Sequence, residues 1–473
     1  MLRRRQGIKH KVLGSSLFFV IMADTPDKPR YWLNTLRHEL FQQVLPWWLN
    51  KSLDKEGGGY FNCIYEDGSL FDTTKYIWLQ GRQVWMLAKI YGDPKYDDRF
   101  FQDQGLSEIN NHVILKAAIH GAEFLVKHAI KEDGQVWFSL NQKGEPVQFQ
   151  RKPWGACFLC MGLIELARVM PESMATEAAK FYKQGVDTFR LILQWFEAPW
   201  LLGTKFGSGQ PATSSLAVPM ILLNMCFEMR QCLGDPDEND ATPLRLLEGD
   251  EDVVLLDICE QKEKWCVDEI KKHIKYDESK NGDKAPTISK VLETVGPNGE
   301  ILDGATGRLI NPGHVIEAGW FLMQYASQIK SDDLFKLGQS VATWAFDYGW
   351  DSDEEKAPNG GILYFLDASK KYSPMELEWD MKLWWPHTEA MIAFAMAYKK
   401  TGDQRMWQKF QKVADYSLQT FKDHDNGGEW FGYCNRKGEL THRFKGGAYK
   451  GCFHIPRSLW MCVSILDDIC NKE

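Results

Sequence analysis

The sequence predicts an all-α protein, an (α/α)6 barrel of twelve helices with short β-hairpins in the long loops at one face. Two observations lead to this fold. Segments with helical periodicity or a wholly apolar character recur along the chain, and the connections between them alternate between long glycine- and aromatic-rich loops and shorter turns. A unit of helix, long loop, helix and turn that recurs in this way is typical of such a barrel, in which the even-numbered helices form the inner ring.

The twelve helices are predicted from apolar periodicity and from the capping and breaking residues at their ends. Pro171 and Ser331, for example, mark two of the short connections between them. In chain order the predicted helices span 30–50, 75–91, 107–130, 154–170, 172–197, 214–233, 253–276, 313–329, 332–348, 376–400, 403–421 and 449–469.

Four long connections carry a glycine-aromatic segment that ends in a second turn, which predicts a short β-hairpin. These segments are 57–68, 133–144, 360–371 and 427–438. An acidic stretch at 234–252 is expected to be a surface insertion. Residues 1–28 are expected to be a disordered extension, because their short apolar run is interrupted by Gly14, Ser15 and Ser16 and is a poor signal peptide. Residues 29–473 would then form one barrel domain.

Charge and cysteine content exclude several classes of function. The net charge is −8 and no long basic run follows the first dozen residues, which argues against a nucleic-acid or anionic-membrane partner. The eleven cysteines have no repeating spacing and are expected to be reduced thiols of a cytoplasmic protein. Cys157 and Cys160 form a CxxC pair in an apolar run, where core packing is expected rather than zinc binding.

The most distinctive stretch is LINPGHVIEAGWFLMQY at 309–325. A proline two places before His314 suits the first turn of a helix, so His314 is predicted near a helix N-terminus, with Glu317 beside it at i+3. The surrounding positions are apolar, which predicts a buried helix. From these residues alone the pair is either a core histidine satisfied by an acid, which is the commoner case, or part of a reactive site.

Two other even-numbered helices carry polar residues near their starts. Tyr76 and Arg82 lie in the otherwise apolar run 75–85, where a buried guanidinium needs a carboxylate or an anionic ligand. The run KLWWPHTEAM places tandem tryptophans before Pro386, which is expected to kink the helix. Its candidate residues are Lys382, Trp384, Trp385, His387 and Glu389. A structural ion pair in the first run and an aromatic core in the second remain open alternatives.

The last helix follows a glycine-rich turn and brings His454 into its first turns. The sequence has no GxxxxGK[ST] pattern, so a phosphate site of that kind is not predicted. Because the N-termini of the even-numbered helices should open on one barrel mouth, His314, His387 and His454 are expected to meet there. A metal is not predicted, since His314 has no second histidine at i+4.

With these motifs assembled, the chain resembles the N-acylglucosamine 2-epimerase family. The resemblance rests on YIWLQGRQVWM, NPGHVIEAGWFL, LEWDMKLWWPHTEAMIAF, GGEWFGY and KGCFHIPR, and it spans 30–469. It implies an (α/α)6-barrel isomerase that interconverts N-acetyl-D-glucosamine and N-acetyl-D-mannosamine in amino-sugar and sialic acid metabolism. Such an enzyme removes the C2 proton of the open-chain sugar and returns a proton to the opposite face of an enediol-type intermediate.

The same resemblance implies a role for each candidate residue. His314 and His454 would be the acid and base on opposite sides of the sugar, and Arg82 would stabilise the oxygen that becomes negative. The sugar would be bound by Tyr76, Glu317, Lys382, Trp384, Trp385, His387 and Glu389. This chemistry requires neither a redox cofactor nor a metal.

Regulation and partners are also expected from the resemblance. ATP or another nucleotide is expected as an effector that is not consumed, with the glycine-rich stretch 203–211 as its candidate loop. The protein is expected to be a homodimer and to bind renin. Two alternatives stay open: a glycoside hydrolase or lyase on the same barrel that uses Glu317 and Glu389, and a non-catalytic renin-binding regulator.

Overall fold

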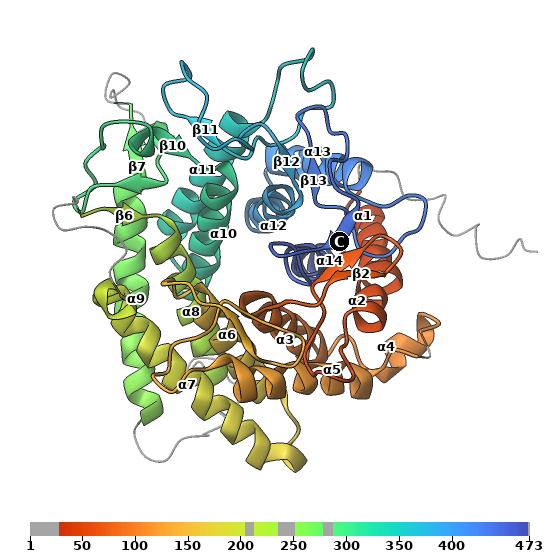
Figure 1. The fold of residues 1–473 in the computed structure, drawn as a ribbon. Coiled ribbons are helices and arrows are strands. Elements are labelled where there is room, and N and C mark those ends of the chain that lie inside the picture. Colours follow the sequence, from red (N-terminus) through yellow and green to blue (C-terminus); the bar gives the residue numbers. More distant parts are fainter. Residues whose placement is uncertain (1–27, 107, 204–211, 235–250, 278–286, 472–473) are drawn as a thin grey trace, which may run out of the picture.

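The helices form two concentric rings (Figure 1). The computed structural model describes residues 28–106, 108–203, 212–234, 251–277 and 287–471. The inner ring consists of α3 (Ile77–Gly92), α6 (Trp154–Val169), α8 (Ala217–Leu233), α10 (Pro312–Gln328), α12 (Trp384–Thr401) and α14 (His454–Cys470). Each inner helix packs against the next one along the chain, and α14 also contacts α3. The predicted (α/α)6 barrel is confirmed.

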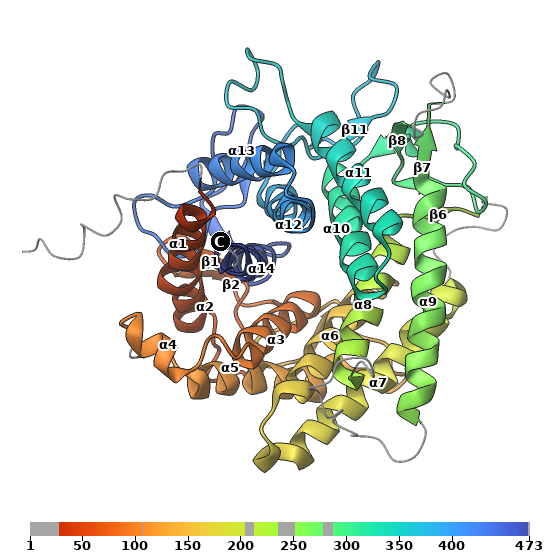
Figure 2. The same cartoon turned by 180° about the vertical axis from the view of Figure 1, so that it is seen from behind.

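The outer ring covers the inner helices, as the view from behind also shows (Figure 2). It is formed by α1 (Pro29–His38) continued by η2 (Glu39–Val44) and α2 (Leu45–Lys51), α5 (Asn111–Phe124) continued by η3 (Leu125–Ala129), α7 (Ala175–Glu197), α9 (Glu251–His273), α11 (Asp332–Gly349) and α13 (Gln404–Thr420). Helices α5 to α13 pack on the inner helix that precedes them, whereas α1 packs on α14 and so joins the two ends of the barrel.

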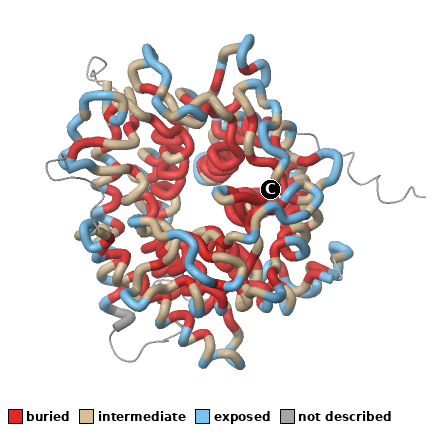
Figure 3. The backbone as a smooth tube through the Cα atoms, viewed as in Figure 1, coloured by how far each residue is buried: buried red, intermediate tan, exposed pale blue. Residues whose placement is uncertain are grey.

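Burial follows the distribution of apolar residues. The inner helices are buried along most of their length because they are apolar on nearly every side, whereas the outer helices bury one face (Figure 3). Each of the twelve predicted helical segments has a counterpart among the described residues. The prediction missed the short elements α4 (Asp98–Asp103), η5 (Pro199–Leu202) and η7 (Thr306–Arg308), whereas η4 (Glu172–Met174) lies at the start of the helix predicted at 172–197.

Short antiparallel strands decorate one end of the barrel. They are β1 (Cys63–Tyr65), β2 (Leu70–Asp72), β3 (Lys75–Tyr76), β4 (Ser139–Leu140), β5 (Pro146–Gln148), β6 (Ser214–Ser215), β7 (Ile274–Tyr276), β8 (Ile288–Val291), β9 (Thr294–Val295), β10 (Leu309–Ile310), β11 (Leu366–Asp367), β12 (Lys382–Leu383), β13 (Tyr433–Cys434) and β14 (Phe444–Gly446). The sheets are β14-β1-β2, β3-β4-β5, β10-β11, β12-β13, β6-β9 and β7-β8.

The hairpin prediction is right for three segments and wrong for one. The segments at 57–68 and 133–144 lead into the hairpins β1–β2 and β4–β5. The segment at 427–438 leads into a narrow hairpin, in which Cys434 and Leu440 form an antiparallel bridge, while β13 also pairs with β12. The segment at 360–371 forms no hairpin of its own among the described strand pairings, since β11 pairs with β10. Because β10 and β12 lie immediately before inner helices, these pairings tie the long loops to the starts of α10 and α12.

Four inner helices begin later than predicted. Helix α8 begins at Ala217 rather than at residue 214, because Ser214 and Ser215 form β6. Lys75 and Tyr76 form β3 and Lys382 lies in β12, so none of these residues is helical. The last helix begins at His454 rather than at residue 449. Pro386 is the third residue of α12, where a missing N–H breaks no intrahelical hydrogen bond, so the physical reason for the predicted kink is absent.

Several predicted segments cannot be compared with the structure. The extension 1–28, the loop 203–211 and the acidic stretch 234–252 lie outside the described residues, apart from residues 28, 203, 234, 251 and 252. Cys157 and Cys160 are buried in α6, in agreement with core packing. In the part of the chain that the structure describes, none of the helices has the length and apolar character needed to cross a membrane.

Buried lysine–aspartate pairs attach the long loops to the inner helices. Among the described residues this arrangement recurs three times, as Lys75–Asp54 at 2.7 Å, Lys382–Asp351 at 2.9 Å and Lys445–Asp423 at 2.8 Å between Nζ and Oδ2. Each aspartate follows an outer helix and also accepts a backbone N–H two residues ahead. Each lysine precedes an inner helix and also donates to a glycine carbonyl in the loop, at Gly58, Gly361 or Gly427. We call these pairs the loop clamps.

The loop clamps predict that two aspartates of one turn, Asp423 and Asp425, contribute unequally to the free energy of unfolding. Asp423→Asn should destabilise the fold by about 3–5 kcal/mol, because it leaves the buried Lys445 ammonium without its carboxylate. Asp425→Asn, two residues further along and exposed, should change the free energy of unfolding by less than about 0.5 kcal/mol. Denaturant unfolding followed by tryptophan fluorescence measures both. Equal effects would contradict the clamp.

The same clamp gives a direction for the pH dependence of stability. Burial alone would raise the pKa of Asp423, but Lys445 and the backbone donor Asn426 hold that pKa below its ordinary value. A carboxyl whose pKa is lower in the folded state stabilises the fold above its ordinary pKa, and this contribution is lost as the pH falls through the lowered value. The stability difference between the wild type and Asp423→Asn should therefore shrink on acidification below about pH 4.

Candidate active site

A cavity of about 570 Å³ opens at the N-terminal ends of the inner helices, and we call it the central pocket. Every inner helix contributes side chains to its wall. Ten of its 22 lining residues are aromatic: Trp78, Trp154, Phe158, Phe321, Tyr364, Trp384, Trp385, Tyr433, Tyr449 and Phe453. Against this wall stand five charged or imidazole groups on the inner helices: Arg82, His314, Glu317, His454 and Arg457. The predicted meeting of helix starts at one barrel mouth is confirmed.

The start of α10 places His314 at the pocket. Asn311 caps the helix through its side chain, which accepts a hydrogen bond from the His314 N–H at 3.2 Å, and Pro312 supplies the first helical residue. Residue 313 is a glycine because a Cβ at this position would lie 2.4 Å from the Trp385 ring. The imidazole of His314 therefore reaches the pocket wall, where about 30 % of its side-chain surface is accessible.

A carboxylate that the sequence did not point to orients His314. Both carboxylate oxygens of Glu293, between β8 and β9, lie 3.1 Å from His314 Nδ1. Since a carboxylate only accepts, Nδ1 carries the hydrogen and donates it, and Nε2 is left without a partner among the described residues. Burial would lower the pKa of His314, but the Glu293 carboxylate raises it above its ordinary value.

His454 is oriented by a buried network beneath the pocket. Its Nδ1 lies 2.7 Å from Glu389 Oε1, so Nδ1 donates and Nε2 is again left without a partner within the described chain. Glu389 is fully buried on α12 and also accepts from Trp320 Nε1 at 2.8 Å. Arg457, one turn beyond His454 on α14, donates to Glu389 at 2.6 Å and to Glu317 at 2.8 Å. The network therefore links α10, α12 and α14.

The two histidines stand in opposite electrostatic surroundings. Burial and the nearby guanidinium groups of Arg82 and Arg457 lower the pKa of His454 well below its ordinary value. The indole of Trp385 lies between the two imidazoles, with ring centroids 5.3 Å from His314 and 5.8 Å from His454. One pocket thus holds an imidazole that favours its charged form and another that favours its neutral form.

Arg82 is a buried cation that aromatic rings hold. Its guanidinium lies 4.6, 4.0 and 4.6 Å from the ring centroids of Trp78, Phe158 and Phe453. It makes no hydrogen bond or ion pair with any described residue, and burial lowers its pKa to about 9. A buried guanidinium in this state is costly unless a ligand supplies an electronegative oxygen. Arg82 is therefore a ready donor for a developing negative charge.

The acidic groups of the network also have the chemical types of metal ligands. Glu317, Glu389 and His454 bring their potential ligand atoms within 4.8 Å of one another. A metal suits this set poorly, because Arg457 already donates to both carboxylates and supplies the positive charge between them. The absence of a metal from the reaction stays a prediction.

The structure gathers most of the predicted site residues and separates three from them. Arg82, His314, His454, Glu317, Trp384 and Trp385 line the central pocket, and Glu389 lies directly beneath it. Tyr76, Lys382 and His387 do not line it. Lys382 belongs to a loop clamp, and Tyr76 lies in β3 against Phe138.

His387 is a core residue rather than a sugar ligand. Its Nδ1 donates to the Leu383 carbonyl at 2.6 Å, and its Nε2 accepts from the Ile362 N–H at 2.8 Å. Burial lowers its pKa to about 3, so the imidazole is neutral at ordinary pH. Both ring nitrogens are therefore used in holding the loop to the start of α12.

Three residues of the site were missed from the sequence. Arg457 could be placed with His454 in the first turns of the last helix, but it was given no role, although the i+3 spacing puts the two side chains on one face. Asn224, which is 5 % exposed on α8, lines the pocket without any polar neighbour in sequence that would have drawn attention to it. Glu293 lies 21 residues before His314 in a loop, and only the folded chain brings the two together.

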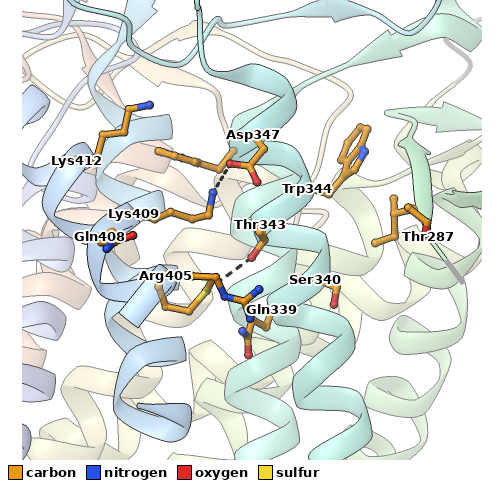
Figure 4. A pocket seen from close by; sticks show the side chains of 13 residues that line it. Thr287, Gln339, Ser340, Thr343, Trp344, Asp347, Arg405, Gln408, Lys409 and Lys412 are labelled. Carbon is orange, nitrogen blue, oxygen red and sulfur yellow. Dashed lines mark hydrogen bonds and ion pairs between the residues drawn. The ribbon is translucent and has the colours of Figure 1, made fainter. Parts of the chain in front are cut away.

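A larger cavity of about 690 Å³ lies outside the barrel between α11 and α13 (Figure 4). Among the described residues that line it there is no histidine or cysteine, and Lys409 pairs with Asp347 across the gap. Arg405 pairs with Asp403 on its own helix start. Because its lining offers neither an imidazole nor a thiol among the described residues, this cavity is a poorer candidate for a reaction than the central pocket.

Comparison with known proteins gives the same family over most of the chain. A sequence model described as N-acylglucosamine 2-epimerase (GlcNAc 2-epimerase) matches residues 289–456. N-acylglucosamine 2-epimerase of Bos taurus is 38 % identical over 448 residues, which cover 94 % of this chain and 93 % of the relative. The Homo sapiens protein of the same name is 36 % identical over 445 residues, covering 93 % and 91 %.

Solved structures of more distant proteins share the fold. Cellobiose 2-epimerase from Spirochaeta thermophila DSM 6192 superposes with a TM-score of 0.66 at 17 % identity, covering 93 % of this chain and 98 % of the other. D-mannose isomerase superposes with a TM-score of 0.64 at 15 % identity, covering 94 % and 99 %.

The two arginines of the pocket should respond in opposite ways to the same substitution. Arg82→Met removes a buried cation that has no carboxylate partner, so the free energy of unfolding should stay unchanged or rise by about 1 kcal/mol. Arg457→Met leaves two buried carboxylates without their cation and should cost about 3–5 kcal/mol. Denaturant midpoints compare the two variants. A large loss of stability in Arg82→Met would show that its rings and its charge are structural.

Proposed function

The chain belongs to the N-acylglucosamine 2-epimerase family, and on that premise we propose that it interconverts N-acetyl-D-glucosamine and N-acetyl-D-mannosamine. The observation that carries this proposal is the pair His314 and His454 on the wall of one pocket. A carboxylate holds each ring through Nδ1, and neither Nε2 has a partner among the described residues. Inversion at C2 needs a proton to leave one face of the sugar and another to arrive at the opposite face. Two imidazoles in one pocket meet that requirement.

The reaction balances without any cofactor. In the open-chain sugar the C1 carbonyl acidifies the C2 proton, and a base removes it. The electrons of the C–H bond form a C1–C2 double bond while the carbonyl oxygen becomes negative. When a proton returns to C2 from the other face, the carbonyl reforms and the configuration at C2 is inverted. No atom is oxidised or reduced overall.

Each residue of the pocket has a role that its surroundings support. His314 and His454 exchange the C2 proton, because an imidazole near neutral pH serves as acid or base. Arg82 stabilises the negative oxygen, since its guanidinium has no other polar partner among the described residues and lies in an apolar wall. Trp384 and Trp385 offer indole faces to the apolar side of the sugar.

The acidic residues hold the basic ones in place. Glu389 accepts a hydrogen bond from His454 Nδ1 and so fixes that ring. Glu317 and Glu389 both accept hydrogen bonds from Arg457. A glycoside hydrolase would need these two carboxylates on either side of a scissile bond. Here both accept from the same Nη2 of Arg457, and Glu389 is fully buried, which favours the epimerase over that alternative.

Cellular context and partners stay predictions from the family. We propose a place in amino-sugar and sialic acid metabolism and cytoplasmic localisation. A nucleotide effector, a homodimer and binding to renin are proposed on the same basis, and the candidate nucleotide loop 203–211 lies, but for Gly203, outside the described residues.

Solvent exchange tests the proposed reaction directly. Incubation of the protein with N-acetyl-D-mannosamine in D2O should give N-acetyl-D-glucosamine that carries deuterium at C2, because the C2 proton exchanges with an imidazole open to solvent. Proton NMR of the H2 signal and mass spectrometry of the product measure the label. Product without deuterium at C2 would rule out this deprotonation.

Removing either imidazole should suppress turnover. His314→Asn and His454→Asn should each lower kcat/KM by roughly 10²–10⁴-fold, because each deletes one of the two proton-transfer groups. His424→Asn, at an exposed histidine that does not line the central pocket, is the matched control and should retain wild-type activity. Comparable activity in all three variants would exclude the two-histidine mechanism.

A further inference from the structure

We propose that Glu293 is a positioning residue that places the resting proton of the histidine pair on His314, so that His454 is the base that begins turnover. The inference rests on the proposed epimerase function and goes beyond it, because it assigns the starting roles of two groups that are chemically alike. It depends on where Glu293 is held, on what faces each imidazole, and on which ring nitrogen remains free.

The backbone holds Glu293 between two inner helices. Its N–H donates to the Leu309 carbonyl at 2.9 Å, and its own carbonyl accepts from the Leu216 N–H at 2.9 Å. Leu309 leads into α10 and Leu216 leads into α8, so the carboxylate is fixed relative to both helix starts. Its neighbour Leu292 is fully buried and packs with Val295 and Ile310. Glu293 is therefore anchored like a residue of the barrel and not like one of a free loop.

The surroundings of His314 favour a positive ring. Glu293 places both oxygens 3.1 Å from Nδ1, and Glu317 adds a second negative charge from α10 itself. From α12 the neighbouring group is the Trp385 indole, and from α14 it is the His454 imidazole. Tyr364 and His273 also face Glu293, and burial leaves both in their neutral forms near neutral pH. Among these described groups, none places a fixed positive charge against His314.

The surroundings of His454 favour a neutral ring. The guanidinium groups of Arg82 and Arg457 act on it from α3 and α14. Its carboxylate partner Glu389 is shared, since the same Oε1 also accepts from Arg457 at 2.6 Å. Glu317 and His314 are the remaining titratable groups that act on it from α10. The negative charge that could hold a proton on His454 is thus already balanced by Arg457.

These surroundings give the histidine pair a direction. In the resting protein Nε2 of His454 is an unprotonated acceptor and Nε2 of His314 carries a proton. The first half-reaction moves the C2 proton to His454, and the second moves the His314 proton to the opposite face of C2. After turnover the two rings have exchanged states, so His454 must release its proton to solvent and His314 must take one from solvent before the next cycle. The sugar whose C2–H faces His454 is the one that the resting protein is ready to accept.

The pH profile of kcat/KM tests this role, because a merely structural carboxylate would not move it. The alkaline limb should report loss of the His314 proton, and the acid limb should report protonation of His454. Glu293→Gln keeps an acceptor for Nδ1–H but removes the charge, so the alkaline limb should move to lower pH by about one unit or more. Glu293→Asp keeps the negative charge but places it further from His314. Its alkaline limb should therefore lie between those of the wild type and of Glu293→Gln.

A charged neighbour in the same region provides the control. Glu300 lies on the exposed side of the turn after β9, bonded to Asn298, and Glu300→Gln should leave both limbs in place. An alkaline limb that stays at the wild-type pH in Glu293→Gln, or in Glu293→Asp where the first variant does not fold, overturns the inference. Wild-type protein that incorporates no deuterium at C2 overturns the proposed function instead, so the two failures are distinct.

Discussion

The centre of the barrel depends on the hydrogen bonds that the Arg457 guanidinium donates to two buried carboxylates. This guanidinium bonds carboxylates from α10 and α12 while its own helix, α14, carries His454, so one buried cation joins three inner helices at the level of the pocket. Two buried carboxylates would repel each other without it. Because Glu389 in turn fixes His454, the packing of the inner ring and the orientation of a reacting imidazole rest on the same hydrogen bonds.

The pocket combines paired and unpaired charges for different purposes. Arg457 is paired with two carboxylates and serves the fold, whereas Arg82, in the second turn of the neighbouring helix α3, is surrounded by aromatic rings and is available to a ligand. The two histidines differ in a similar way, since one faces an unshared carboxylate and the other faces guanidinium groups. Identical side-chain types therefore acquire different chemistry from their neighbours alone.

Local signals in the sequence identified much of the fold and part of the site. The Asn-Pro-Gly start of α10 and the spacing of His454 in α14 are determined by nearby residues, so His314, Glu317 and His454 could be placed on their helices in advance. Lys382 and His387 looked equally functional, yet tertiary contacts with Asp351 and Ile362 make them structural. Glu293 carries no local signal, because its meeting with His314 exists only after α8 and α10 have packed.

The loop clamps separate the foundation of each long loop from its tip. In these three loops the aspartate and the lysine are fixed near the two ends of the loop, whereas exposed residues between them, such as Leu377 and Tyr372, take no part in the clamp. Mutations at the tips can therefore accumulate without displacing the histidines below. A barrel built in this way can change the shape of its entrance, and with it the range of sugars admitted, while inheriting the same chemistry intact.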